Sequence, residues 1–204
     1  MVREMTDRMA AWLRHGVAAP AYLAAALLWS APAAAQMDQA RAAFDKEDYA
    51  AAYALYKPAA DQGTAEAQYH VALMHKFGWG TERDHAVAAR LFRAAAEQAH
   101  AEAQSELAIY YKDGRGVAKD MAQAAAWFQK ASAQGVGIAQ LNLGRFYLAG
   151  TGVDKDPMAA YYWLTVAAQN GYIDGMALRV PAARELTPEQ IAETEARAKQ
   201  ARRR

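Results

Sequence analysis

Hydrophobic residues recur three and four positions apart along most of the chain, which is the spacing of one buried face of an α-helix. The clearest example covers residues 65–77, and its apolar positions return 36 residues later and again after another 36. A second apolar set, which begins at Ala88, returns at the same interval. The pattern therefore predicts an all-α chain in which each 36-residue unit contains two helices.

Glycine and aspartate mark the predicted helix ends. A Gly-x-Gly pair follows the first helix of each unit, and an aspartate precedes the second. A glycine just past a helix end adopts the left-handed cap easily, and an aspartate accepts hydrogen bonds from free N–H groups at a helix start. Each unit is thus predicted to be an antiparallel helix pair. The marker residues are Gly78, Gly80 and Asp84; Gly114, Gly116 and Asp120; and Gly150, Gly152 and Asp156.

Both ends of the repeat region depart from this pattern. Upstream, a short helix at about 38–46 is predicted, followed by a helix that Pro58 is expected to kink. Downstream, a helix is expected to be interrupted at Pro181, and Thr187 with Gln190 forms a capping box that starts the last helix. These atypical ends are typical of the caps that close a solenoid.

The first 35 residues have the pattern of a leader. A basic start precedes an apolar run of 13 residues at 17–29, and Ala33, Ala34 and Ala35 then fit a small-x-small cleavage site. The pattern predicts cleavage before Gln36, export to the periplasm or secretion, and no stable membrane insertion afterwards. An uncleaved anchor is the alternative, but the run is shorter than the roughly 20 residues that span a bilayer. No cysteine follows it to carry a lipoprotein anchor.

A repeat of fixed length between twenty and fifty residues predicts a solenoid of stacked helix pairs. The predicted parts are a signal peptide at 1–35, a capping helix pair at 36–64, three repeats at 65–100, 101–136 and 137–172, and capping helices with a basic tail at 173–204.

The repeated motif resembles the Sel1-like repeat, a branch of the tetratricopeptide-type helical repeats. Residues 101–135 nearly complete its pattern, A-x-A-Q-x-x-L-(G/A)-x-x-Y-x-x-G-x-G-V-x-x-D-x-x-x-A-x-x-W-(F/Y)-x-x-A-(A/S)-x-x-G. The resemblance implies a right-handed superhelix with the first helix of each pair on the concave side. It also implies a binding or adaptor role, often in export-related, envelope-stress or polysaccharide-regulating assemblies. Some secreted members with paired cysteines are linked to β-lactam binding, and that link does not transfer to a chain without cysteine.

The net charge of the chain after the leader and the motifs in its sequence argue against several classes of function. Removing three arginines and two acidic residues with the leader from 23 basic and 22 acidic residues leaves 20 of each, which argues against a nucleic-acid partner. No G-x-S-x-G or phosphate-loop motif is present. His70 and His75 lie five residues apart and so diverge on a helix, and His75 takes a core position. We therefore expect no catalysis, cofactor or metal site.

The candidate binding residues lie between the core positions of the first helices. An apolar stripe among them is expected to bind a peptide, a helix or a partner domain. The predicted residues are Tyr69, Leu73 and Lys76; Ser105, Ile109 and Lys112; and Leu141, Arg145 and Leu148. Three aromatic residues outside the core pattern are expected to be exposed, and they either anchor a partner or pack on a neighbouring repeat. These are Trp79, Tyr161 and Tyr162.

The leading hypothesis is a non-enzymatic adaptor, scaffold or regulator of the bacterial cell envelope. A polysaccharide- or cell-wall-associated protein is the first alternative, with the three exposed aromatic residues stacking on sugars. A hydrolase of envelope substrates is the second alternative. It requires a nucleophile with a base, or a metal, and the sequence shows neither.

Overall fold

The computed structural model describes residues 34–201, and every regular element in this part of the chain is an α-helix. The predicted signal peptide therefore lies outside the described residues except for its last two positions, as do the last three residues of the basic tail. A first helix covers 34–45. The helices that follow are α3 (Tyr49–Asp61), α4 (Ala65–Phe77), α5 (His85–Glu97), α6 (Ala101–Asp113), α7 (Met121–Ala133), α8 (Gly137–Ala149), α9 (Pro157–Gln169), α10 (Asp174–Ala183) and α11 (Pro188–Ala201).

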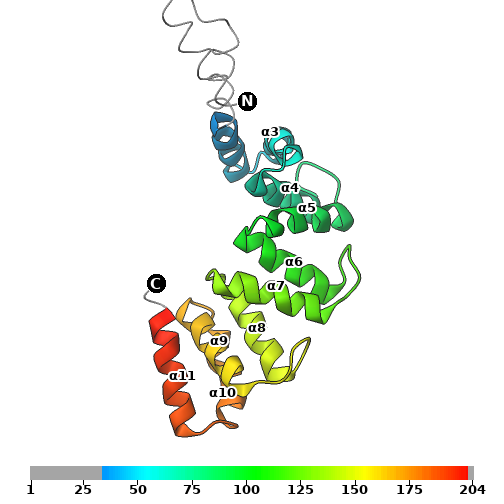
Figure 1. Ribbon diagram of the computed structural model, residues 1–204. Coiled ribbons are helices and arrows are strands. Elements are labelled where there is room, and N and C mark those ends of the chain that lie inside the picture. The colour runs from blue at the N-terminus through cyan, green and yellow to red at the C-terminus, as the bar shows by residue number, and fades with distance from the viewer. Residues whose placement is uncertain (1–33, 202–204) are drawn as a thin grey trace, which may run out of the picture.

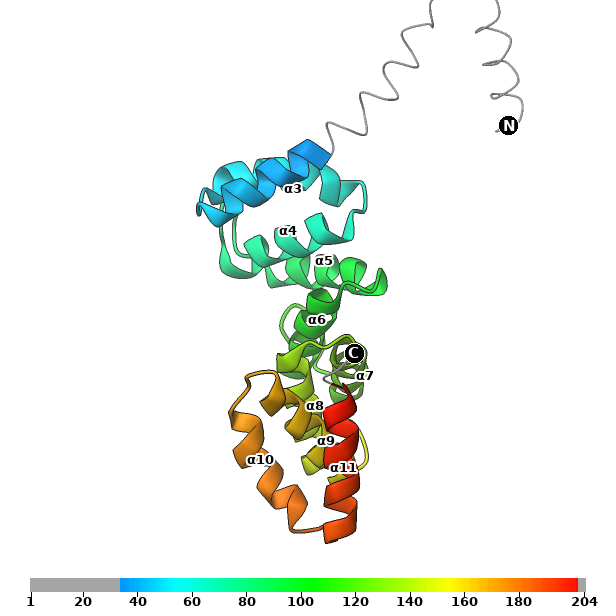
Figure 2. The ribbon, with the colours of Figure 1, turned by 90° about the vertical axis from the view of Figure 1, so that its left-hand side faces the viewer.

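The helices pack in sequence order as antiparallel pairs, α4 with α5, α6 with α7, and α8 with α9. Each pair also packs on the next, so the chain forms a curved stack (Figure 1). The first helix and α3 lie at one end of this stack, and α10 and α11 lie at the other (Figure 2). The predicted all-α solenoid is confirmed. None of the helices within 34–201 is long and apolar enough to cross a membrane.

The Gly-x-Gly loops end one helix and also set the spacing of the stack. Gly114 caps α6 in the left-handed conformation at φ 73°, and its N–H donates to the Tyr110 carbonyl, as predicted. The second glycine has a further role. A Cβ added to Gly116 would lie 2.1 Å from the His85 carbonyl oxygen, at the start of the preceding α5. Each loop therefore rests directly on backbone of the repeat before it, because the other two loops make the same approach to Tyr49 and Met121.

The aspartates start the second helix of each pair, as predicted. The Asp120 carboxylate accepts from the Gln123 N–H at 2.9 Å, and that of Asp156 accepts from the Ala159 N–H at 3.0 Å. The Asp84 carboxylate accepts two such bonds, from Val87 and Ala86, and they hold its pKa below the usual value. These caps satisfy N–H groups that the helix itself leaves free.

Interlocking side chains from successive helices form a continuous core along the stack. Phe92 and Tyr110 meet edge to face at 5.3 Å, and both are fully buried. Gly144 lies so close to α9 that an added Cβ would be 2.6 Å from Leu164 Cγ, so α8 and α9 approach each other closely at this point. Leu107 and Leu143 are fully buried at equivalent positions of α6 and α8. The predicted 36-residue apolar pattern is therefore the pattern of the core.

A ladder of buried amide side chains runs through the repeats. Gln104 Nε2 donates to the Ala96 carbonyl at 3.0 Å, and Gln104 Oε1 accepts from Gln134 Nε2 at 2.7 Å. One repeat earlier Gln68 makes the same bonds, and one repeat later Gln140 does. The glutamine of the repeat motif thus joins the start of its own helix to the end of the helix before it and to the end of the helix after it.

The terminal elements differ in part from the sequence prediction. The first helix covers 34–45 rather than about 38–46. The predicted interruption at Pro181 is wrong, because α10 continues through it to Ala183. Pro181 has no N–H to donate to the Ala177 carbonyl four residues earlier. Both residues are exposed, so water can hydrogen-bond to that carbonyl instead. The predicted capping box is confirmed, with the Thr187 N–H donating to Gln190 Oε1 at 2.9 Å.

Candidate functional site

The nine candidate residues form three rows across α4, α6 and α8, one residue of each row on each helix. The first row is Tyr69, Ser105 and Leu141; the middle row is Leu73, Ile109 and Arg145; and the last row is Lys76, Lys112 and Leu148.

The first row is largely buried between successive repeats. Ser105 and Leu141 are only 3% and 4% exposed, so their prediction as partner contacts is corrected. Leu141 packs in a cluster with Leu164 of α9 and Leu178 of α10. Tyr69 stacks on His100 with ring centroids 4.6 Å apart, and burial raises its pKa to about 12. This row holds the stack together.

The middle row is the accessible part of the predicted surface. Leu73 and Ile109 are half-buried, with one side of each packed against the core. Arg145 is exposed. Phe77, at the end of α4 and one turn beyond Leu73, is also exposed, at 39%. Residues of α4, α6 and α8, the first helices of three successive repeats, therefore present an apolar strip that ends in a positive charge.

The side chains of the last row and their contacts differ from one repeat to the next. Lys76 Nζ lies 2.8 Å from both carboxylate oxygens of Glu106, and this half-buried ion pair joins α4 to α6. One repeat later the equivalent positions hold Lys112 and Asn142. Because Lys76 is engaged in packing the repeats, it is less available to a partner than its position in the sequence indicates.

Two of the three predicted aromatic anchors serve as packing residues. Trp79 stacks on both Tyr49 and Phe77, with centroids 4.7 and 4.4 Å apart, and joins the N-terminal core. Tyr161 is only 4% exposed, so its predicted exposure is wrong. Its hydroxyl donates to Glu195 Oε1 at 2.8 Å, because α11 folds back over this part of α9. Long-range packing of the C-terminal helix buries a residue that the repeat pattern alone leaves outside.

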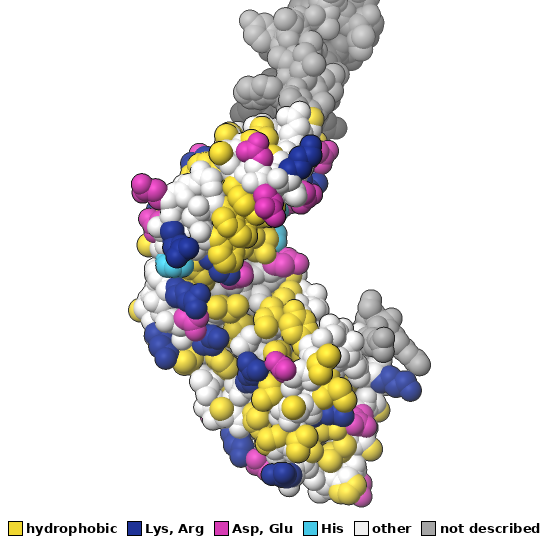
Figure 3. Space-filling view, turned by 180° about the vertical axis from the view of Figure 1, so that it is seen from behind, with side chains coloured by type: hydrophobic (Ala, Val, Ile, Leu, Met, Phe, Trp, Pro, Cys, Tyr) yellow, Lys and Arg dark blue, Asp and Glu magenta, His cyan; other side chains and the backbone are white. Residues whose placement is uncertain are grey.

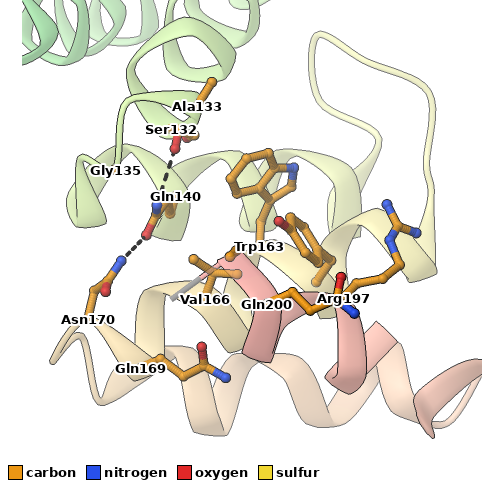
Figure 4. A pocket seen from close by; sticks show the side chains of 12 residues that line it. Ser132, Ala133, Gly135, Gln140, Trp163, Val166, Gln169, Asn170, Arg197 and Gln200 are labelled. Carbon is orange, nitrogen blue, oxygen red and sulfur yellow. Dashed lines mark hydrogen bonds between the residues drawn. The ribbon is translucent and has the colours of Figure 1, made fainter. Parts of the chain in front are cut away.

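Tyr162 remains half-exposed and borders a hollow of about 610 Å³ (Figure 4). The hollow lies between the ends of α7, α9 and α11, and Trp163 and Arg197 also line it. The Arg197 guanidinium lies 5.4 Å from the centre of the Tyr162 ring. Two buried polar atoms on residues of its wall, Ser132 Oγ and Gln169 Oε1, have no hydrogen-bond partner among the residues that the structure describes. The sequence pattern does not predict this hollow, because α11 lies outside the repeat.

The histidines within 34–201 contact other groups of the protein. No group of three or more His, Cys, Asp and Glu side chains in this part of the chain is placed to hold a metal ion. His85 Nδ1 lies 3.1 Å from the Tyr110 hydroxyl, and His100 accepts from the Ala103 N–H at 3.4 Å. His75, predicted as a core residue, is half-buried between the Tyr53 hydroxyl and the Glu82 carbonyl.

His70 makes stability depend on pH. Its ring stacks on Tyr56 at 4.6 Å, and burial lowers its pKa below the usual 6.5. The unfolded chain therefore takes up a proton at higher pH than the folded one, so stability is lost as pH falls through about 6.5. We expect His70→Phe to lose less stability than the wild type between pH 7.5 and about 5.5, as measured by urea unfolding at several pH values. Equal losses in the two proteins would contradict this assignment.

Comparison with known proteins identifies the class. The family model of the Sel1 repeat matches residues 44–64, 65–100, 101–136 and 137–172, so the chain belongs to the Sel1 repeat family. Members of this family are generally protein-interaction modules and typically non-catalytic scaffolds. A search of curated proteins gave no match to this chain.

Solved structures show the same fold. A protective antigen present in uropathogenic Escherichia coli strains, which displays an SLR fold, is 35% identical with a TM-score of 0.66, over 74% of this chain and 32% of that one. A Sel1 repeat protein from Oxalobacter formigenes is 27% identical with a TM-score of 0.66, over 69% of this chain and 58% of that one. The chain thus spans about a third of the first protein's length and less than two thirds of the second's.

Proposed function

We propose that this protein is a non-enzymatic adaptor or scaffold of the bacterial cell envelope, and that it binds a peptide, a helix or a partner domain across α4, α6 and α8. The family supports a protein-binding role. The observation that carries the proposal is the middle row, where Leu73 and Ile109 present apolar side chains beside the exposed Arg145. A partner segment with apolar residues followed by an acidic residue matches this surface.

The envelope location rests on the sequence of the leader and on how the mature chain would begin. Cleavage before Gln36 would leave residues 36–45 of the first helix. Gln36 Nε2 donates to the Leu55 carbonyl at 3.3 Å, and Met37 packs against the N-terminal core. The new N-terminus would therefore remain attached to α3. Mass spectrometry of the protein purified from cells should find Gln36 at or near its N-terminus, and an intact leader would count against export with cleavage.

The binding surface can be tested by comparing two double variants. Ile109→Gln with Arg145→Glu changes the middle row, whereas Arg90→Glu with Ala126→Gln makes matched changes at exposed positions of α5 and α7. Tagged proteins are cross-linked in envelope preparations, and captured proteins are quantified by mass spectrometry. We expect the first variant to recover the main partner at least about tenfold less than the wild type, since a central contact contributes more than about 1.4 kcal/mol.

The control variant should recover the partner at the wild-type level, and both variants should melt within a few degrees of the wild type. Equal recovery by the two variants would place the binding surface elsewhere. The sugar-binding alternative is weakened, because Trp79 and Tyr161 are engaged in packing and only Tyr162 borders an open hollow. Turnover of a cell-wall substrate by the purified protein would favour the hydrolase alternative.

A further inference from the structure

The helix α10 has the place of the first helix of a further, unfinished repeat after the one at 137–172. The chain enters it through the turn that precedes each earlier first helix. The Tyr172 N–H donates to the Ala167 carbonyl at 3.0 Å, as the Val136 N–H donates to the Ala131 carbonyl at 3.1 Å. Gly171 has a φ of 91°, close to the 92° of its equivalent one repeat earlier. From this turn α10 packs on α9 as α8 packs on α7.

One face of α10 is apolar and exposed to solvent. Ile173 is 76% exposed, Met176 is 56% exposed and Val180 is 47% exposed. Their spacing of three and four residues places them on one side of the helix. Phe77 is the only other large hydrophobic residue within 34–201 that is similarly exposed. Viewed from behind, hydrophobic side chains gather over the end of the molecule that contains α10 (Figure 3).

The same face is covered in the complete repeat before it. The positions equivalent to Ile173, Met176 and Val180 are Gly137, Gln140 and Gly144, and all three are buried. Gly144 is covered by Leu164 of α9, and the Gln140 side chain bonds to Asn170 at the end of α9. The exposed face of α10 is therefore the face on which the second helix of a repeat packs.

The last helix of the chain does not occupy this place. α11 packs on α9, and Figure 2 shows α10 and α11 on opposite sides of α9. The chain between them lacks a Gly-x-Gly loop. Leu186 and Ile191 instead join the cluster around Tyr161, and the Tyr161–Glu195 hydrogen bond holds α11 there. The position of a second helix beside α10 is left open.

We propose that an amphipathic helix of a partner protein docks on this face of α10 and completes the unfinished repeat. The interface continues the one that α9 makes with α8. Val180 stands where α8 has Gly144, so the docked helix must present a small side chain such as alanine where α9 presents Leu164. Larger apolar side chains fit beside Ile173 and Met176 at the other end. This surface is separate from the middle row, so the inference does not depend on the function proposed above.

A peptide with the sequence of residues 84–99 and the change Phe92→Ala is a suitable probe. It derives from α5, an alanine-rich second helix of this chain, and Phe92 stands at the position that Leu164 has in α9, where the docked helix needs a small side chain. Fluorescein-labelled peptide is titrated with the full chain, and fluorescence anisotropy is measured. We expect a dissociation constant in the micromolar range. In NMR spectra of the full chain, the peptide should change the chemical shifts of the backbone amides of α10. Met176→Glu with Val180→Glu should weaken it at least tenfold, whereas Ala196→Glu, an exposed change on α11, should not.

Both substituted positions of α10 are exposed, so the double variant should keep the wild-type helix content and melting temperature. No binding at about 1 mM protein, or equal binding by the double variant and the control, would overturn the proposal. Sedimentation supplies a further check. A dimer that dissociates in the Met176→Glu, Val180→Glu variant would show that a second copy of the chain covers α10, and would also overturn it.

Discussion

Gly116→Ala is expected to destabilise the protein by about 2–4 kcal/mol, one of the two largest effects we predict. A Cβ there would lie 2.1 Å from the His85 carbonyl oxygen and 2.4 Å from its carbon, both of which are backbone atoms that a rotamer change cannot move. The residue also has a φ of 64°, which disfavours a side chain. The loop after α6 must therefore lift away from α5. Urea unfolding followed by circular dichroism measures the loss.

Gly135→Ala is the matched control. Gly135 also has a positive φ, of 92°, but nothing lies within 4 Å of an added Cβ. The equivalent position in the preceding repeat is Ala99, which adopts a φ of 64°, so this turn already accepts alanine once in the chain. We expect a loss of about 1 kcal/mol or less. Similar losses for the two variants would show that φ alone, rather than contact between repeats, decides the cost at Gly116.

Gln104→Leu is expected to cost about 2–3 kcal/mol, although leucine has a similar size and is apolar. Gln104 is 4% exposed, and its amide bonds to the Ala96 carbonyl at 3.0 Å and to Gln134 Nε2 at 2.7 Å. Leucine can replace neither bond, so the Ala96 carbonyl loses its side-chain donor and Gln134 loses its acceptor. Because each repeat contacts only its neighbours, the loss should also make unfolding less cooperative.

The exposed Gln123 on α7 provides the control, and Gln123→Leu should change stability by less than about 0.5 kcal/mol. Chemical unfolding of both variants, with the slope of the transition recorded beside its midpoint, tests the prediction. A Gln104→Leu variant as stable as the wild type would mean that the amide ladder contributes no net stability.

The candidate site was predicted only in part. The repeat pattern places the nine residues on the first helices, which is where the structure has them. It does not distinguish Ile109, which is half-buried, from Ser105, which lies one turn away and is almost fully buried. Both residues fall outside the core positions that recur every 36 residues. Only the distance between stacked helices decides which of the two side chains is accessible to a partner. The same limit explains why Tyr161 was expected to be exposed.

The sequence alone determined the helix pairs, their caps and their 36-residue spacing, because these depend on contacts within one unit. The predicted bounds of α4 and the aspartate caps are those of the structure. Contacts between units were decided by the tertiary structure: the second glycine against the backbone of the repeat before it, the glutamine ladder, and the return of α11 to α9. The spacing of hydrophobic residues along a helix indicates which side of that helix is buried. It does not indicate which distant segment buries that side, and for that reason the open face of α10 is a property of the packed helices and not of the repeat pattern.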